Sequence, residues 1–224
     1  MSRSRRQPAA FTLVELLIVV AIIAMLVSVL LPSLSAAREM AKVAVAHAEL
    51  SGVGTALELF AEDHAGRYPP VRCYCNPDVA ADTCKLPVEL GAGGYLPAGG
   101  ESGMETAVQD VFNPGHTYKY KAPGDMVFND GLPVGESFEV WVPRDFPNDP
   151  VGGDPRATDD LVAHRSPATS PVSWVVYSVG PRPASEKVVT PRMPIARNTW
   201  YGGVGDAGVI VRIKGPRGTY VSRP

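Results

Sequence analysis

The first sixty residues contain very little glycine and proline. Of the chain's 22 glycines and 22 prolines, this segment holds only Gly52, Gly54, Pro8 and Pro32. Both residue types interrupt helices, glycine because it loses the most backbone entropy on folding and proline because it lacks an N–H group. Their scarcity predicts a long helix at the start of the chain, and their abundance afterwards predicts a turn-rich globular body.

Charge is also scarce, both in the whole chain and in one segment. The chain has 21 Lys and Arg against 23 Asp and Glu, a net charge of −2. This balance excludes a generally basic nucleic-acid-binding protein. Residues 11–31 (FTLVELLIVVAIIAMLVSVLL) carry a single charge, Glu15. A helix of about 20 apolar residues crosses a bilayer core, so this run is long enough to span a membrane.

The ten residues before the apolar run include three arginines and no acid. Basic residues stay on the cytoplasmic side of a membrane. We therefore expect a single pass through the inner membrane, with the N-terminus in the cytoplasm and the body periplasmic or extracellular. An ordinary secretory signal has a shorter apolar region that ends in a small-residue cleavage site, which this segment lacks. A plain anchor leaves Glu15 unexplained, because a charge within a bilayer costs about 2.5–3.5 kcal/mol.

Residues 10–17 (AFTLVELL) resemble the N-terminal signature of type IV pilins and type II secretion pseudopilins. In that family a prepilin peptidase removes a short basic leader, and the new N-terminal residue is N-methylated. The resemblance implies cleavage between Ala10 and Phe11 and methylation of Phe11. It departs from the family at Ala10, where glycine is usual. Residues 55–69 also resemble the corresponding stretch of the major type II pseudopilins.

The resemblance also implies roles for Glu15 and Pro32 in assembly. In a filament, the Glu15 carboxylate of one subunit would pair with the Phe11 ammonium of a neighbour, since either charge alone is costly in an apolar core. Pro32 stands where the family often has a helix-kinking proline. The expected function is that of a structural subunit, not an enzyme. Its expected partners are other pilin-like subunits in a homo- or hetero-polymer, prepilin peptidase, an inner-membrane assembly platform and membrane lipid, with no nucleic acid.

These features divide the chain into four expected segments. They are a cleaved leader (1–10), the transmembrane half of the helix (11–31), its outer amphipathic half (32–66) and a loop-rich β domain (67–224). In the outer half, apolar residues recur at spacings of three or four, at positions 37, 41, 44, 48, 53, 57 and 60. Gly66, followed by two prolines, marks the helix end. We expect Val53, Leu57 and Phe60 to face a sheet.

The expected fold class is α+β and pilin-like, with one antiparallel sheet of three to five strands packed on the outer half of the helix. Short β-rich runs between turns predict the strands, at residues 117–121, 137–142, 172–178, 208–214 and, more weakly, 219–222. Residues 175–181 resemble the late strand and turn of the major pseudopilins. Segment 70–115 is expected to be mostly loop, with one helical turn near 85–90 or 104–111. Trp141, Trp174 and Trp200 are expected in the core or on a sheet face.

Three cysteines, Cys73, Cys75 and Cys84, lie close together in the sequence. The export context favours one disulfide, Cys75–Cys84 or Cys73–Cys84, with one thiol left over. A structural zinc site would require a fourth ligand, and no histidine lies within a few residues of the three.

One acid-rich stretch, residues 144–160, is the candidate metal site. Major type II pseudopilins often bind calcium in a loop of the C-terminal region. The resemblance therefore makes Asp149, Asp154 and Asp159 candidate oxygen ligands for calcium. The alternative is a solvated loop without a metal, and no other cofactor is expected.

Catalytic motifs are weak. The chain has no G-x-S-x-G and no H-E-x-x-H string, and its four histidines are scattered. Residues 203–208 fit G-x-G-x-x-G, but they open a β-like run instead of a helix, so we expect a turn. The alternative function is a membrane-anchored periplasmic enzyme or ligand-binding domain with an uncleaved N-terminal helix. It predicts an intact Met1 and a pocket with convergent polar groups.

Overall fold

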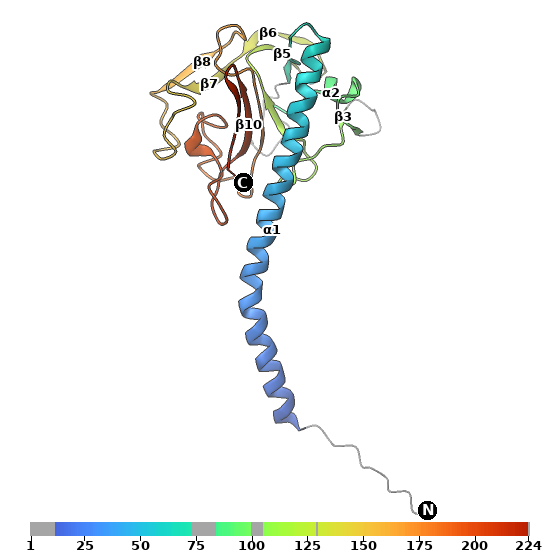
Figure 1. Cartoon of the computed structure of the whole chain (residues 1–224), viewed down its shortest axis with the longest axis vertical. Helices are drawn as coiled ribbons and strands as arrows, with labels where there is room; N and C mark the ends of the chain where they lie inside the picture. Colours follow the sequence, from blue (N-terminus) through green and yellow to red (C-terminus); the bar gives the residue numbers. More distant parts are fainter. Residues whose placement is uncertain (1–11, 73–83, 100–104, 129, 224) are drawn as a thin grey trace, which may run out of the picture. The chain divides into compact units, whose positions relative to one another are not determined.

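The structure is a computed structural model and describes residues 12–72, 84–99, 105–128 and 130–223. The chain divides into two compact units, Met1–Glu39 and Met40–Pro224. One long helix, α1 (Leu13–Asp63), begins in the first unit and ends in the second (Figure 1). The long helix expected from the scarcity of glycine and proline is therefore present.

The helix runs through Pro32 and ends where the sequence predicts an end. Pro32 lies inside α1, which continues on both sides of it. After Asp63 the backbone turns left-handed at Ala65 and Gly66, with φ of 56° and 79°. The Gly66 N–H donates a 2.7 Å hydrogen bond to the Ala61 carbonyl oxygen. Such a bond satisfies one of the last carbonyl groups of a helix, which have no partner within the helix itself.

The main sheet has four antiparallel strands in the order β11-β10-β9-β4. The strands are β4 (Lys119–Lys121), β9 (Trp174–Ser178), β10 (Ile210–Gly215) and β11 (Gly218–Val221). Each overlaps a predicted strand, with bounds shifted by one or two residues. The α+β, pilin-like prediction is confirmed.

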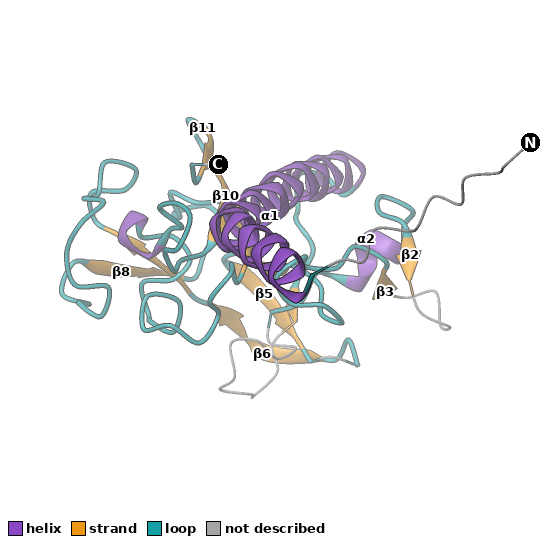
Figure 2. Ribbon diagram, turned by 90° about the horizontal axis from the view of Figure 1, so that it is seen from below, coloured by secondary structure: helices purple, strands orange, loops and turns teal. Residues whose placement is uncertain are grey.

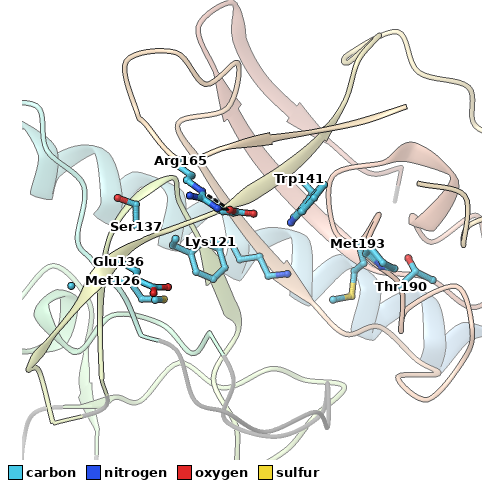
Figure 3. A pocket seen from close by; sticks show the side chains of 12 residues that line it. Lys121, Met126, Glu136, Ser137, Trp141, Arg165, Thr190 and Met193 are labelled. Carbon is cyan, nitrogen blue, oxygen red and sulfur yellow. Dashed lines mark hydrogen bonds and ion pairs between the residues drawn. The ribbon is translucent and has the colours of Figure 1, made fainter. Parts of the chain in front are cut away.

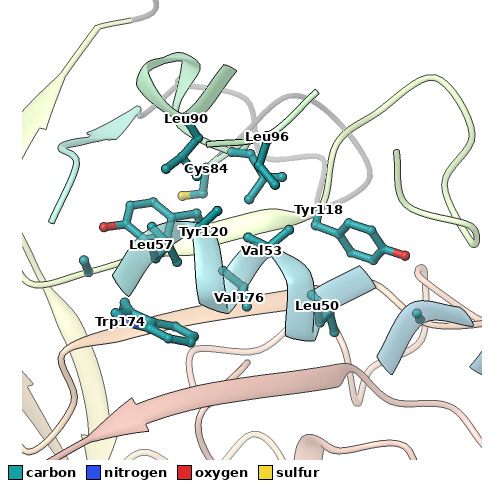
Figure 4. Close-up of a cluster of buried hydrophobic side chains, with 14 of the residues drawn as sticks. Leu50, Val53, Leu57, Cys84, Leu90, Leu96, Tyr118, Tyr120, Trp174 and Val176 are labelled. Atoms are coloured by element: carbon teal, nitrogen blue, oxygen red, sulfur yellow. The ribbon is translucent and has the colours of Figure 1, made fainter. Parts of the chain in front are cut away.

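Strand β9 is buried on both faces, which explains its unbroken apolar sequence. Side chains alternate across a strand. Trp174 and Val176 belong to the hydrophobic cluster that includes α1, whereas Val175 and Tyr177 belong to a second cluster on the opposite face. Figure 4 shows Trp174 and Val176 beside the side chains of α1. The sheet is therefore covered on both sides.

One stripe of α1 packs on the sheet. Its buried members include Val43, Ala46, Leu50, Val53, Leu57 and Phe60. These residues are three or four apart, the spacing that keeps side chains on one face of a helix. The prediction that Val53, Leu57 and Phe60 face the sheet is confirmed. Tyr120 of β4 and Tyr118, the residue directly before β4, are fully buried in the same cluster.

Smaller elements surround the main sheet (Figure 2). A three-stranded sheet has the order β1-β5-β6, and two hairpin-like pairs are β2–β3 and β7–β8. These strands are β1 (Val71–Arg72), β2 (Ala98–Gly99), β3 (Glu105–Thr106), β5 (Gly124–Val127), β6 (Pro133–Phe138), β7 (Val140–Pro143) and β8 (Leu161–His164). A short helix, α2 (Val88–Ala92), overlaps one of the two predicted turns, and a 3-10 turn, η1, covers Arg197–Thr199.

One predicted strand needs correction. Residues 137–142 do not form one strand, because β6 ends at Phe138 and β7 begins at Val140, in a different sheet. Trp141 takes the second of its two expected places, a sheet face: it is 44% exposed, while its neighbours Val140 and Val142 are buried. Alternation along β7 turns the two valines inward and the indole outward.

The predicted turn at residues 203–208 is confirmed, and its last glycine has a packing reason. Gly208 has φ of 147°, and a Cβ there would lie 2.5 Å from the Trp200 carbonyl carbon. The two backbone segments approach so closely that a side chain at position 208 has no room. The G-x-G-x-x-G pattern therefore reflects a tight chain reversal.

Candidate assembly site on the N-terminal helix

Thr12 and Glu15 form a reciprocal cap at the start of α1. The Thr12 N–H and hydroxyl donate hydrogen bonds of 2.9 and 2.8 Å to Glu15 Oε2. The Glu15 N–H donates in return to Thr12 Oγ1 at 3.2 Å. This is a capping box, in which two otherwise unpartnered N–H groups of the first turn are satisfied. The carboxylate thus has partners within its own chain.

The capping box was not anticipated from the sequence, although its signal is present there. Thr12-Leu-Val-Glu15 directly precedes the apolar run, and a Ser or Thr followed three residues later by Glu is the usual pattern. Ala10 and Phe11, the predicted processing residues, lie outside the described residues. The cleavage and methylation predictions therefore remain predictions.

The first half of α1 is apolar around its whole circumference. Every Leu, Ile, Val and Met side chain from Leu13 to Leu34 is between 43% and 78% exposed. Soluble monomers rarely leave a continuous apolar surface of this kind uncovered. Among the described residues, α1 is the one helix long and apolar enough to cross a membrane. A lipid bilayer or other apolar helices can cover it.

The outer half of α1 carries a second, exposed stripe opposite its buried one. We call it the outer stripe; its members are Ala41, Ala44, Val45, Ala48, Gly52, Thr55 and Leu59. None is charged, and the Thr55 hydroxyl donates to the Ser51 carbonyl oxygen at 3.1 Å, within the helix. The apolar residues at positions 41, 44 and 48, which have the same helical spacing as the sheet-facing residues, are exposed. The helix has two uncharged stripes, of which its own body covers one.

Two helix acids, Glu49 and Glu58, accept hydrogen bonds from the body. Trp174 Nε1 donates to Glu58 Oε1 at 2.8 Å, and the Tyr68 hydroxyl donates to the same oxygen at 3.2 Å. The Tyr118 hydroxyl donates to Glu49 Oε2 at 2.5 Å. Burial, with Glu58 nearby, raises the pKa of Tyr68 to about 12, and burial beside Glu49 raises the pKa of Tyr118. These bonds fix the register of α1 on the sheet.

The structure places one of the three cysteines. Cys84 is buried in the same cluster as Leu90 and Leu96 (Figure 4). Cys73 and Cys75 lie outside the described residues. The pairing Cys75–Cys84 or Cys73–Cys84 stays a prediction.

The three candidate calcium ligands differ in burial and in hydrogen-bond partners. Asp149 is buried, and its Oδ2 accepts a 2.7 Å hydrogen bond from the Arg197 N–H. Asp154 is exposed and accepts from the Arg156 N–H at 2.9 Å, and Asp159 is exposed. Within the described ranges, no three His, Cys, Asp or Glu side chains gather closely enough to hold a metal ion.

A polar groove in the body has a volume of about 790 Å³ (Figure 3). Its described lining includes no histidine or cysteine. Arg165 in the groove forms an ion pair with Glu139, and Lys121 lies 5.6 Å from the centre of the Tyr177 ring. The charges of Arg165 and Glu139 are thus engaged with one another.

Comparisons with known proteins agree with this geometry. Residues 5–31 match the prokaryotic N-terminal methylation motif. That motif, an apolar capped helix and a small antiparallel sheet together define a pilin-like protein.

The chain is 30% identical over 121 residues to type II secretion system core protein G of Pseudomonas aeruginosa. The match covers 54% of this chain and 78% of that relative. No solved structure matches the chain. The chain belongs to the family of type II secretion system core protein G, the major pseudopilins. It is a pilin-like subunit of a structural family with an N-terminal membrane anchor.

Proposed function

We propose that the chain is cleaved between Ala10 and Phe11, methylated at Phe11, and polymerised through α1 into a type II secretion pseudopilus or a type IV pilus-like filament. The observation that carries the proposal is the distribution of exposed apolar residues on α1. They surround its first half and form the outer stripe on its second half. Such surfaces are stable when lipid or a neighbouring helix covers them.

The membrane holds the subunit before assembly. Residues 11–31 span the bilayer, the arginine-rich leader stays in the cytoplasm, and the body lies on the other side. The prepilin peptidase then acts at the cytoplasmic end of α1. In this state the Thr12 N–H and hydroxyl donate hydrogen bonds to the Glu15 carboxylate. These bonds lower the free-energy cost of a charge near the bilayer.

Cleavage changes the partners available to Glu15. It creates an ammonium group at Phe11, the residue next to Thr12. In an assembled filament, the Phe11 ammonium of one subunit and the Glu15 carboxylate of another would form a buried pair. Because either charge alone in the filament core is costly, the pair favours one axial register.

The outer stripe is suited to a neighbouring α1 helix. Most of its side chains are small, and small side chains let two helix backbones approach closely. A helix face exposed to water usually carries charged residues, which the outer stripe lacks. We therefore assign the outer stripe to subunit–subunit packing and the body to the filament exterior.

Mass spectrometry of the N-terminal peptide tests the proposal. The full chain is expressed in cells with and without an active prepilin peptidase, and membranes are digested. With the peptidase, the N-terminal peptide should begin at Phe11 and carry a methyl group. A control with Ala10→Gly should be processed at least as completely. An intact residue 1–10 segment in cells with active peptidase would overturn the processing proposal and favour the uncleaved-anchor alternative.

A further inference from the structure

Arg192 is a buried arginine at the base of the acid-rich loop. Its side chain is 4% exposed, although the carboxylate that it binds, Asp160, is 45% exposed. Its Nη1 donates to Asp160 Oδ1 and, at 3.0 Å, to the Ala157 carbonyl oxygen. Its Nη2 donates to Asp160 Oδ2 at 3.2 Å, and its Nε donates to Asn198 Oδ1 at 3.2 Å. All three guanidinium nitrogens therefore have partners.

The residues next to Arg192 attach the rest of the loop. Asn198 Nδ2 donates to the Asp154 carbonyl oxygen at 3.3 Å. The Arg197 N–H donates to Asp149 Oδ2 at 2.7 Å. Residues 149–160 are thus joined to residues 192–198 at both ends and in the middle. Arg192 makes most of these bonds.

The aspartates of this loop do not fit a calcium ion. Calcium takes six to eight oxygen ligands, whereas both Asp160 oxygens bind Arg192 and one Asp154 oxygen binds Arg156. Asp149 Oδ1 is buried and, among the described residues, has no hydrogen-bond partner. It is one oxygen only, and the positive charges of Arg192 and Arg197 act on the same carboxyl group. A divalent cation beside two arginines would be repelled.

We propose that the guanidinium of Arg192 takes the structural place of a calcium ion, so that the 149–160 loop folds without a divalent cation. The planar fork of arginine suits this task, because it binds both oxygens of one carboxylate and still has donors for a carbonyl and an amide oxygen. Arg192 is a positioning residue for the loop. This inference does not depend on how α1 assembles.

The first experiment measures the response of the full chain to calcium in detergent micelles. Thermal unfolding is followed by tryptophan fluorescence in EDTA and in about 5 mM CaCl2, above the range in which extracellular calcium modules bind, about 0.1–1 mM. The expected result is the same Tm in both solutions. A Tm that rises with calcium but not with the same concentration of MgCl2 would overturn the proposal.

The second experiment removes the guanidinium and measures opening of the loop. In Arg192→Gln, trypsin should cut the Arg156–Ala157 bond about tenfold faster or more, since the cut follows the population of the open loop. The matched control is Arg165→Gln, which removes another arginine–carboxylate pair whose arginine is 72% exposed; its cleavage rate at this bond should be unchanged.

A milder variant guards against failure of Arg192→Gln to fold. Arg192→Lys keeps the charge but loses the bidentate fork, and should show intermediate cleavage with a Tm close to that of the parent chain. If both Arg192 variants are cut at the parental rate, Arg192 does not hold the loop and the proposal is wrong.

Discussion

Trp174 and Glu58, 116 residues apart, are joined by a 2.8 Å hydrogen bond from the indole Nε1 to Oε1 of the carboxylate. The bond ties the first residue of β9 to the long helix α1. Trp174 is 1% exposed, so its N–H is shielded from water with the carboxylate in place. The helix and the body are thus held in one register by a buried donor and a partly exposed acid.

Removing that acid should destabilise the body. Glu58→Ala leaves the Trp174 N–H unsatisfied, and an unsatisfied buried donor costs about 1–3 kcal/mol. The free energy of unfolding, measured by denaturant titration of the full chain in micelles, should fall by that amount. Glu62→Ala, at an exposed position of the same helix, is the control and should change little. Equal stability of the two variants would contradict a structural role for the bond.

The two helix glycines should respond in opposite directions to alanine. A Cβ on Gly54 would lie 2.9 Å from Trp174 Cη2 and 3.0 Å from Arg212 Nε, whereas a Cβ on Gly52 has nothing within 4 Å. Gly54→Ala should cost about 1–3 kcal/mol through overpacking. Gly52→Ala should stabilise the subunit by about 0.5–1 kcal/mol, because glycine is a poor helix former. The test compares the denaturation midpoints of the two variants. A higher midpoint for Gly54→Ala than for Gly52→Ala would contradict this prediction.

A charge on the outer stripe should prevent assembly without unfolding the subunit. Ala48 is exposed, so Ala48→Glu should leave the denaturation midpoint within about 0.5 kcal/mol of the parent. A buried, unpaired carboxylate between packed helices is costly, and filaments sheared from cells and counted by electron microscopy should be lost. Glu136→Lys, a charge change at an exposed position of the body, should still assemble. Normal filaments from Ala48→Glu would show that the outer stripe faces solvent.

Glu15 should be needed for assembly but not for insertion. Glu15→Ala removes the carboxylate proposed to pair with a neighbouring Phe11 ammonium, while the apolar run that inserts into the membrane is unchanged. The variant should fractionate with membranes at the parental level and yield no filaments. Thr12→Ala, which removes one of the two donors to Glu15, separates capping from pairing and should still assemble. Parental filament yield from Glu15→Ala would exclude the pairing.

The body should lose stability at high pH because of its buried tyrosines. Burial, with Glu58 nearby, raises the pKa of Tyr68 from 10.0 to about 12, and burial also raises the pKa of Tyr118 and Tyr120. A phenol whose folded pKa exceeds its unfolded pKa contributes stability that is complete below about pH 10 and is lost as the pH rises toward the folded value. Denaturation midpoints should therefore be level up to about pH 10 and fall above it. In Tyr68→Phe the fall should be shallower; a fall as steep as in the parent would rule out a contribution from Tyr68.

Local patterns determined the main parts of this protein. The apolar run of residues 11–31 dictates a membrane-length helix, since no fold of a small body can bury it. The scarcity of glycine and proline sets the helix length, and Gly66 sets its end. The β-rich runs of β9, β10 and β11 were visible because each is short, apolar or alternating, and bounded by turns. The family resemblance at residues 10–17 can be recognised from one continuous segment of the sequence.

Tertiary structure alone decided which side of each element is covered. Alanines at positions 41, 44 and 48 have the same helical spacing as the buried stripe, and only the placement of the sheet shows that they form the exposed outer stripe. Glu58 looks like a solvent-facing charge until Trp174, far away in the sequence, supplies its donor. The acid-rich loop suggested a metal site, but its cation is Arg192, which lies 32 residues from Asp160. Spacing along the chain fixes the direction of a side chain within its own element, whereas its partner depends on how distant segments pack.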